Sequence, residues 1–149
     1  MKRAFIYVGH SNWGKSFALR VITEGNAYKK TVIIKGLWFW VRKMSNDDKP
    51  DELLTAVEAI PESWYDNFIL TYCPNHLEDG QTMEILNILS SSCQLFFFVQ
   101  ESRYSNPSEK IEEHEIAYLR TIGMVEMLKG KHEDSVRANR FRRFITEHL

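Results

Sequence analysis

The chain has few cysteines and no long apolar run, and each shortage excludes a class of protein. Cys73 and Cys93 are too few for a disulfide framework and do not have the spacing of metal ligands. No stretch is apolar over enough residues to span a bilayer, so no membrane protein is expected. The short apolar run at 3–8 is typical of a first strand rather than of a signal peptide. A reducing cytoplasm fits these features, with both cysteines as buried free thiols.

Neither sign of charge dominates, and the histidines form no metal-binding motif. The formal net charge is -1 at pH 7, so no global attraction to nucleic acid or to an anionic membrane is expected, although a local basic patch is compatible with it. The five histidines show no HxxxH or HExxH arrangement, so we predict no zinc site. Apolar residues make up 44% of the 149 residues, which suits one globular domain over residues 1–149.

Strand-like and helix-like segments alternate along the sequence. Runs of β-forming residues predict strands at 3–8, 30–43, 65–73, 93–100 and 124–130. Apolar residues at helical spacing predict helices at 15–24, 51–60, 81–92, 108–123 and 132–149. Gly36 in the second strand indicates a bulge, a bend or a hairpin. We therefore expect a three-layer α/β fold, in which a mostly parallel sheet of about five strands has helices on both faces.

One motif stands between the first strand and the first helix. Residues 9–16, GHSNWGKS, fit the pattern G-x-x-x-x-G-K-[ST], and a loop that wraps a phosphate needs a strand before it and a helix N-terminus after it. Gly9 would let the chain turn off the strand, and Gly14 would let the backbone approach a phosphate without a Cβ. The alternative is an ordinary strand-to-helix turn that contains glycine and lysine by chance, and the position of the motif argues against it.

This segment resembles the Walker A loop of P-loop nucleoside triphosphatases. Its centre is similar to the loop of small GTPases of the ribosome-assembly type, in which GxSNxGKS recurs. The resemblance implies a Mg²⁺-dependent protein that transfers or hydrolyses a γ-phosphoryl group. It implies that Lys15 lies between the β- and γ-phosphates and that Ser16 offers its hydroxyl to Mg²⁺. The implied nucleotide-binding residues are Gly9, His10, Ser11, Asn12, Trp13, Gly14, Lys15, Ser16 and Phe17.

The acidic positions of that family are where the sequence departs from the pattern. A GTPase is expected to show Asp-x-Pro-Gly after the third strand, but Tyr72 replaces the Asp and Asn75 the Gly. Asp79 is then the substitute metal-orienting carboxylate. Glu101, after the fourth strand, is the candidate metal-orienting group or water-activating base, and a solvated loop carboxylate is the equal alternative. The guanine signature Asn-Lys-x-Asp is absent after that strand, so ATP is favoured over GTP.

Two later loops are assigned by their position. The polar loop 101–110 is a candidate lid, in which Arg103 and Lys110 would neutralise charge on the γ-phosphate; the alternative is an ordinary surface loop. Lys129, Gly130 and Lys131 follow the fifth strand, where P-loop proteins often contact the base, with simple solvent exposure as the alternative.

Two clusters outside the loop indicate partners. The aromatic run 36–40 lies beside Lys35, Arg42 and Lys43, a mixture found in stacking platforms for single-stranded nucleic acid, in core strands and in protein-docking patches. The last helix carries arginines that either contact a phosphate, DNA or an acidic neighbour or form a solvated face; they are Arg137, Arg140, Arg142 and Arg143.

Three functions therefore remain open at this stage. The first is an enzyme, either an NTPase or a small kinase, that uses a nucleoside triphosphate and Mg²⁺. The second is a catalytically weak nucleotide-binding module that regulates a protein or nucleic-acid partner, and the missing Asp after the third strand favours it. The third is a structural protein in which the motif is fortuitous.

Overall fold

The computed structural model describes residues 1–10, 13–25, 29–74, 80–106 and 108–149. Its strands form a single six-stranded sheet. Its strands are β1 (Lys2–Val8), β2 (Thr31–Ile34), β3 (Leu37–Val41), β4 (Asn67–Tyr72), β5 (Cys93–Gln100) and β6 (Met124–Leu128). The helices are α1 (Lys15–Ile22), α2 (Pro50–Glu58), α3 (Gly80–Ser92), α4 (Glu113–Ile122) and α5 (Asp134–Glu147).

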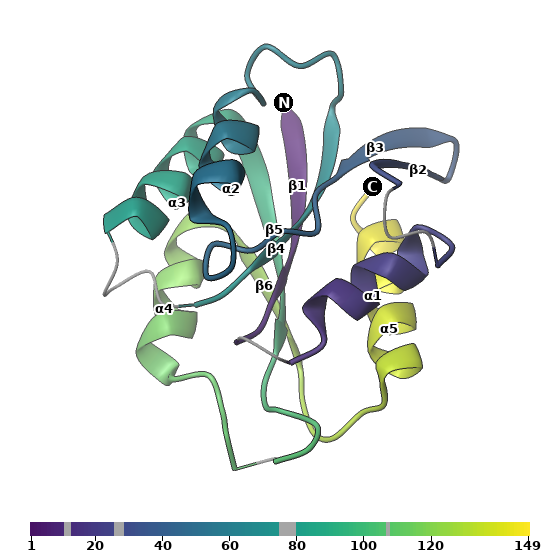
Figure 1. Ribbon diagram of the computed structural model, residues 1–149, viewed down its shortest axis with the longest axis vertical. Helices are drawn as coiled ribbons and strands as arrows, with labels where there is room; N and C mark the ends of the chain where they lie inside the picture. Colours follow the sequence, from purple (N-terminus) through teal and green to yellow (C-terminus); the bar gives the residue numbers. More distant parts are fainter. Residues whose placement is uncertain (11–12, 26–28, 75–79, 107) are drawn as a thin grey trace.

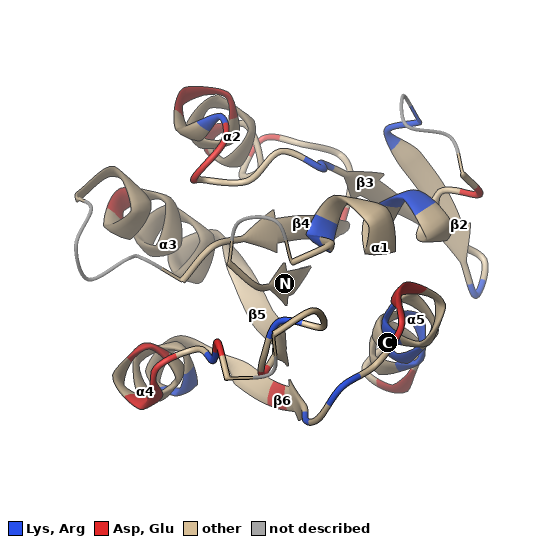
Figure 2. Cartoon of the chain, turned by 60° about the horizontal axis from the view of Figure 1, so that its bottom comes forward, with Lys and Arg blue, Asp and Glu red and all other residues tan. Residues whose placement is uncertain are grey.

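The order of strands places β1 in the middle of the sheet. Neighbours run in the order β2-β3-β4-β1-β5-β6, and every pair is parallel except β2 with β3 (Figure 1). Helices α1 and α5 cover one face, while α2, α3 and α4 cover the other, as Figure 2 shows. This arrangement confirms the three-layer α/β fold with a mostly parallel sheet.

A hairpin accounts for the sixth strand. Lys35 and Gly36 both have positive φ, 52° and 76°, and Ile34 pairs with Leu37 across them. Positive φ at both central residues is typical of a type I′ turn, which joins antiparallel strands through two residues. Of the three possibilities that Gly36 left open, the chain adopts the hairpin, so the segment 30–43 forms two strands.

The central strand is apolar on both sides because both of its faces are buried. Phe5 and Tyr7 of β1 point towards α1 and α5, whereas Ile6 points towards α2, α3 and α4. The Phe5 ring stacks on Phe96 of β5 with centroids 4.8 Å apart, and the edge of Tyr7 meets Phe141 of α5 at 5.3 Å. These contacts fix the end of β1, and with it the start of the loop at residue 9.

The environment of the two cysteines and the length and polarity of the helices match what the sequence predicts. Cys73 and Cys93 are buried thiols outside any disulfide, and burial raises the pKa of Cys93 to about 11 against the opposing effect of Lys2. Within the part of the chain that the structure describes, the helices are too short or too polar to cross a bilayer.

The turn between α4 and β6 leaves no room for a side chain at Gly123, which generates a prediction. A Cβ there would lie 2.7 Å from the carbonyl oxygen of Leu95 on β5. Gly123→Ala is therefore expected to lower the free energy of unfolding in urea by about 1–3 kcal/mol. Gly80→Ala is the matched control, because a Cβ at Gly80 meets no described atom within 4 Å and alanine favours a helix. Equal unfolding free energies for the two variants would contradict this packing.

Candidate functional site

The loop that follows β1 lies at the carboxyl edge of the sheet, between the ends of β4 and β5. The chain leaves β1 towards β3 and later returns to β5 on the other side, so this is a switch point, where α/β sheets bind ligands. The N–H of Gly9 donates to the carbonyl of Tyr72 at 3.1 Å and extends the pairing with β4. Ser11 and Asn12, which the sequence assigns to this loop, lie outside the described residues.

The carbonyl oxygen of His10 organises the described part of the loop. It accepts the N–H of Trp13 at 3.3 Å and the Nζ of Lys15 at 2.8 Å, so the lysine side chain folds back across the loop. Lys15 is only 7% exposed. Burial lowers its pKa, while Asp47 and, to a smaller extent, Cys73 and Asp48 act in the opposite direction.

Helix α1 begins at this loop with backbone donors directed outwards. Gly14 has a φ of 86° and precedes the helix, and its carbonyl accepts the N–H of Ala18 at 3.1 Å. The N–H groups of Lys15, Ser16 and Phe17 have no acceptor within the helix, as at any helix start. The first turn contains no acidic side chain that would compete for them. These amides, the helix dipole and the Lys15 ammonium together form a cradle suited to an anion.

A pocket of about 700 Å³ opens beside this cradle. It is lined by His10, Trp13, Asp47, Cys73, Ser108, Glu109 and Lys110. The Trp13 ring is buried in the core on the α2, α3 and α4 face and meets the edge of the His10 ring at 5.1 Å. The Cys73 Sγ lies 3.7 Å from the Nδ1 of His10. Trp13 therefore anchors the loop, and loop 101–110 contributes one wall of the pocket.

Asp47 is a pocket residue that the sequence analysis missed. The preceding Asn46 is buried; its side chain accepts the N–H of Cys73 at 2.6 Å and donates to the carbonyl of Cys73 at 2.9 Å. The hydroxyl of Thr71 also donates to the carbonyl of Met44, at 3.0 Å. These bonds pin the loop after β3 to the end of β4 and bring Asp47 to the pocket. The adjacent Asp47 and Asp48, in the polar loop that follows β3, were the available signal.

Ser16 faces a second hollow, of about 600 Å³, which Asp48 also lines. A hydroxyl and a carboxylate are oxygen ligands of the kind that Mg²⁺ prefers. Ser16 and Asp48 therefore bring two oxygen donors of this kind to the hollow, while Asp47 lines the neighbouring pocket. Asp79, the metal ligand predicted from the sequence, lies outside the described residues.

Glu101 and Arg103 have partners outside the cradle. The N–H of Glu101 donates to the carbonyl of Leu128 at 3.0 Å, and this half-buried residue is not among those that line the pocket. Arg103 forms an ion pair with Glu109 at 3.3 Å. Loop 101–110 is held by further bonds, among them that from Gln100 to the carbonyl of Ser102 at 2.9 Å. Lys110, the other predicted lid cation, does reach the pocket.

The loop after β6 is exposed at all three positions proposed for base contacts. Lys129, Gly130 and Lys131 face solvent, and the Lys131 Nζ lies 5.0 Å from the centre of the Tyr104 ring. The described residues of the pocket lining do not include them. Their role in binding a base stays a prediction.

Arg137 of α5 is buried behind the cradle instead of lying on a solvated face. It is 3% exposed, it donates to the carbonyl of His132 at 2.9 Å and it pairs with Asp134. A Cβ at Gly14 would collide with its guanidinium. Arg137 therefore joins the loop after β6 to the start of α1, and only glycine fits between them.

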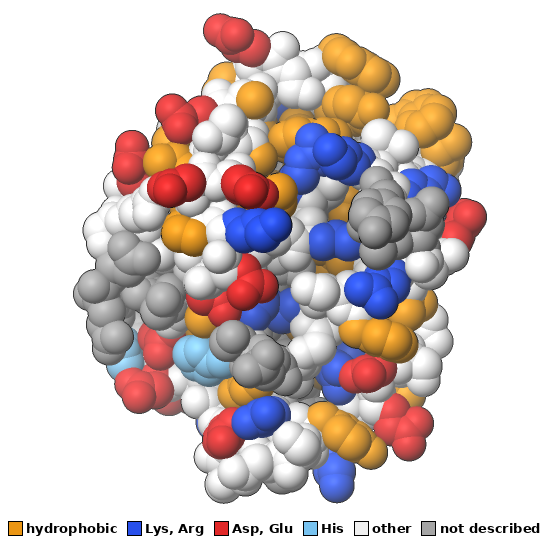
Figure 3. All heavy atoms as spheres, viewed as in Figure 1, with side chains coloured by type: hydrophobic (Ala, Val, Ile, Leu, Met, Phe, Trp, Pro, Cys, Tyr) orange, Lys and Arg blue, Asp and Glu red, His pale blue; other side chains and the backbone are white. Residues whose placement is uncertain are grey.

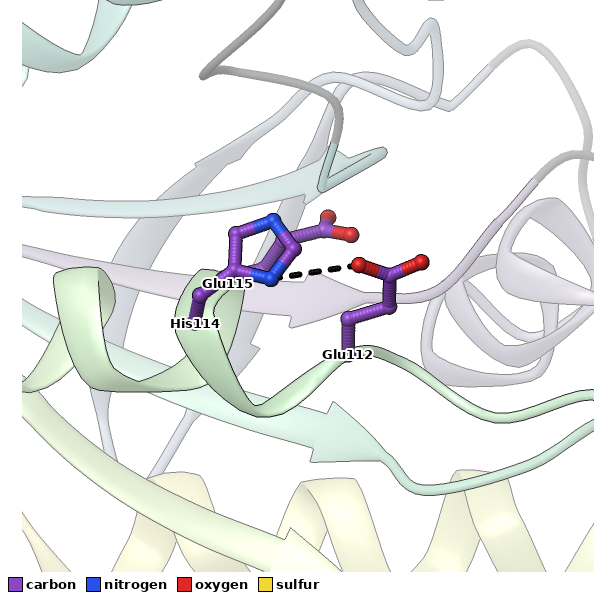
Figure 4. A group of neighbouring side chains, drawn as sticks. All are labelled: Glu112, His114 and Glu115. Atoms are coloured by element: carbon purple, nitrogen blue, oxygen red, sulfur yellow. Dashed lines mark ion pairs between the residues drawn. The ribbon is translucent and has the colours of Figure 1, made fainter.

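A second group of possible metal ligands lies at the start of α4. Glu112, His114 and Glu115 place their ligand atoms within 4.8 Å of one another, and Glu112 pairs with His114 at 3.1 Å (Figure 4). Acidic side chains at a helix N-terminus are also stabilised by the helix dipole. This second explanation accounts for the cluster without a cation.

Comparison with known proteins supports the fold. No family model and no curated protein matches the sequence. A solution NMR structure of a de novo designed PLOOP2X3_50 fold protein has a TM-score of 0.56 at 9% identity, over 99% of this chain and 93% of that one. Another designed protein, with a P-loop NTPase fold, has a TM-score of 0.50 at 17% identity, over 99% and 92%. These likenesses show a P-loop NTPase fold and leave ligand and activity to be proposed.

The surroundings of His10 generate a prediction about pH. Burial and the charge of Lys15 lower the pKa of His10 below 6.5, against opposing effects of Asp47, Glu112 and Glu109. As the pH falls below that value, the unfolded chain binds a proton that folded His10 does not, so stability falls. His10→Gln is expected to remove this contribution, at most about 1.4 kcal/mol per pH unit. Urea denaturation between about pH 5 and about pH 8 measures it, and identical pH profiles would contradict the assignment.

Proposed function

We propose that this chain binds a nucleoside triphosphate with Mg²⁺ and transfers or hydrolyses its γ-phosphoryl group. The observation that carries the proposal is the anion cradle, in which the buried Lys15 side chain lies at the start of α1, whose first amides have no acceptor within the helix. The P-loop NTPase fold and the switch point beside β1 support it. A polyphosphate would accept hydrogen bonds from these amides and replace the His10 carbonyl as the partner of Lys15.

The donor set beside the cradle suits a bound Mg²⁺. Ser16 and Asp48, which line the same hollow, are the residues that would hold it, directly or through water. The cation would neutralise charge that develops on the phosphoryl oxygens. Within the chain itself, Lys15 would orient the β- and γ-phosphates and Lys110 would supply positive charge from loop 101–110.

The pocket beside the cradle suits the attacking group. The pocket is lined by Trp13 and by residues of loop 101–110, and its two carboxylates are Asp47 and Glu109, of which Glu109 is paired with Arg103. A carboxylate in this position would accept a proton from water or from an acceptor hydroxyl, provided that its oxygens are within hydrogen-bond reach of that group. Asp47 is therefore our first choice for the base, ahead of Glu101.

A second candidate function is a nucleotide-binding module with little or no turnover. The end of β4 favours it, because Tyr72 stands where the Asp-x-Pro-Gly pattern has its metal-orienting Asp. In that case the bound nucleotide would regulate a partner. The two functions differ in what the Asp47 carboxylate does. In an enzyme it would take part in turnover, whereas in a binding module there is little or no turnover for it to affect.

Calorimetric titration with ATP and GTP, with and without Mg²⁺, tests binding. Lys15→Ala is expected to weaken ATP binding by about 10- to 100-fold, because a charge-assisted contact is lost. Ser16→Ala should leave Mg²⁺-free binding intact and reduce the gain that Mg²⁺ gives. Arg120→Ala, which removes an exposed cation from α4, is the control. Unchanged affinity in folded Lys15→Ala, verified by thermal melting, would reject the site.

Phosphate release, measured with and without a nucleoside acceptor, tests turnover. Asp47→Asn is expected to lower the rate by about 100-fold or more with little change in ATP affinity, as for loss of a general base. Glu101→Gln should have a much smaller effect, because Glu101 is not among the residues that line the pocket. The opposite ranking would restore Glu101 as the base, and the absence of turnover in the unmodified protein would favour the binding module.

A further inference from the structure

A basic groove lies between α1 and α2, over the carboxyl end of β3. It is the hollow of about 600 Å³ beside Ser16, and Lys and Arg side chains gather in this region in Figure 3. Its lining contains six cations and two carboxylates, Asp48 and Glu52. The cations are Arg20, Lys29, Lys30, Arg42, Lys43 and Lys49. Such an excess of positive charge in a chain whose net charge is -1 attracts an anionic ligand locally.

The cations of the basic groove are crowded. Burial and, secondarily, the positive charge of Arg20 lower the pKa of Lys43. Lys49 has a carboxylate partner in Glu52 at 4.0 Å, but both side chains are more than half exposed, and such pairs contribute little. A bound phosphate would relieve the repulsion between Lys43 and Arg20. The groove is thus suited to more than one phosphate group.

An aromatic platform, formed by Trp38 and Trp40, continues the groove along β3. Side chains alternate along a strand, so Phe39 is buried towards α1 and α5 while Trp38 and Trp40 face the other way. Trp38 is 51% exposed, and the Arg42 guanidinium lies 3.6 Å from the centre of the Trp40 ring.

The groove and the platform are contiguous. A further hollow, of about 510 Å³, reaches Trp40 along α2. It shares three lining residues with the basic groove, namely Arg42, Met44 and Glu52. A ligand that follows this path would meet positive charges first and flat rings next. Trp38 faces solvent because the hairpin of β2 and β3 extends beyond α2 (Figure 1), whereas Trp40 is half-buried against the core.

We propose that the basic groove and the aromatic platform bind single-stranded nucleic acid. Its phosphates would lie among Arg20, Lys43 and Lys49, and its bases would stack on Trp38 and on the exposed face of the Arg42 guanidinium. A peptide of acidic residues alone would satisfy the cations but offers no flat rings to the platform. A duplex would keep its base faces stacked and out of reach. Only a single strand matches both features.

Fluorescence anisotropy with a labelled oligothymidylate of about 15 nucleotides tests the proposal. If five phosphates are neutralised, the affinity should fall about 100-fold between about 50 mM and about 200 mM salt. Lys43→Ala should weaken binding and reduce the magnitude of the log–log salt slope by about 0.7. Trp38→Ala should weaken it by about tenfold with the slope unchanged, because stacking is not ionic.

Arg120→Ala, which removes one positive charge on the remote α4, should bind the oligonucleotide normally. Lys15→Ala should also bind it normally, because Lys15 does not line the groove, so a failure of nucleotide binding is distinguishable from a failure here. No binding to the oligonucleotide at low salt would overturn the proposal. Equal competition by a duplex or by a polyglutamate peptide would overturn it too, because either result would reduce the surface to a general anion patch.

Discussion

The first turn of α1 presents backbone N–H groups that the helix cannot satisfy, and the rest of the site is built around them. The buried strand β1 delivers the loop to this point, and its aromatic contacts with β5 and α5 hold it there. Arg137 packs behind Gly14 and fixes the other side of the turn. These contacts hold the turn from both sides, and such preorganisation lowers the entropic cost of binding a ligand.

The electrostatics of the loop favour an anion. Burial lowers the pKa of both Lys15 and His10, which means that their surroundings disfavour positive charge in the free protein. Asp47 and Asp48 offset only part of this cost at Lys15. A polyphosphate in the cradle would stabilise the charged form of both groups. Binding is therefore expected to be coupled to proton uptake at His10.

The fold could be predicted from the sequence because its strands are apolar runs and its helices show apolar residues at helical spacing. The apolar runs at 3–8 and 93–100 became the paired central strands, and the described residues of the motif, 9–10 and 13–16, lie at the end of β1 and the start of α1. The position of Asp47 in the pocket could not be predicted from the sequence. Only the bonds between Asn46 and Cys73, which is 27 residues away, bring it there. The burial of Arg137 depends likewise on packing between α5 and α1, which helical spacing does not reveal.

The central claim is that the amides at the start of α1 bind phosphate. A titration of ¹⁵N-labelled protein with ATP, followed by amide NMR shifts, tests it most directly. The account predicts that the largest changes occur at Gly14, Lys15, Ser16 and Phe17 and that inorganic pyrophosphate reproduces them without a base. Unchanged signals at these four amides, with changes confined to another surface, would contradict it.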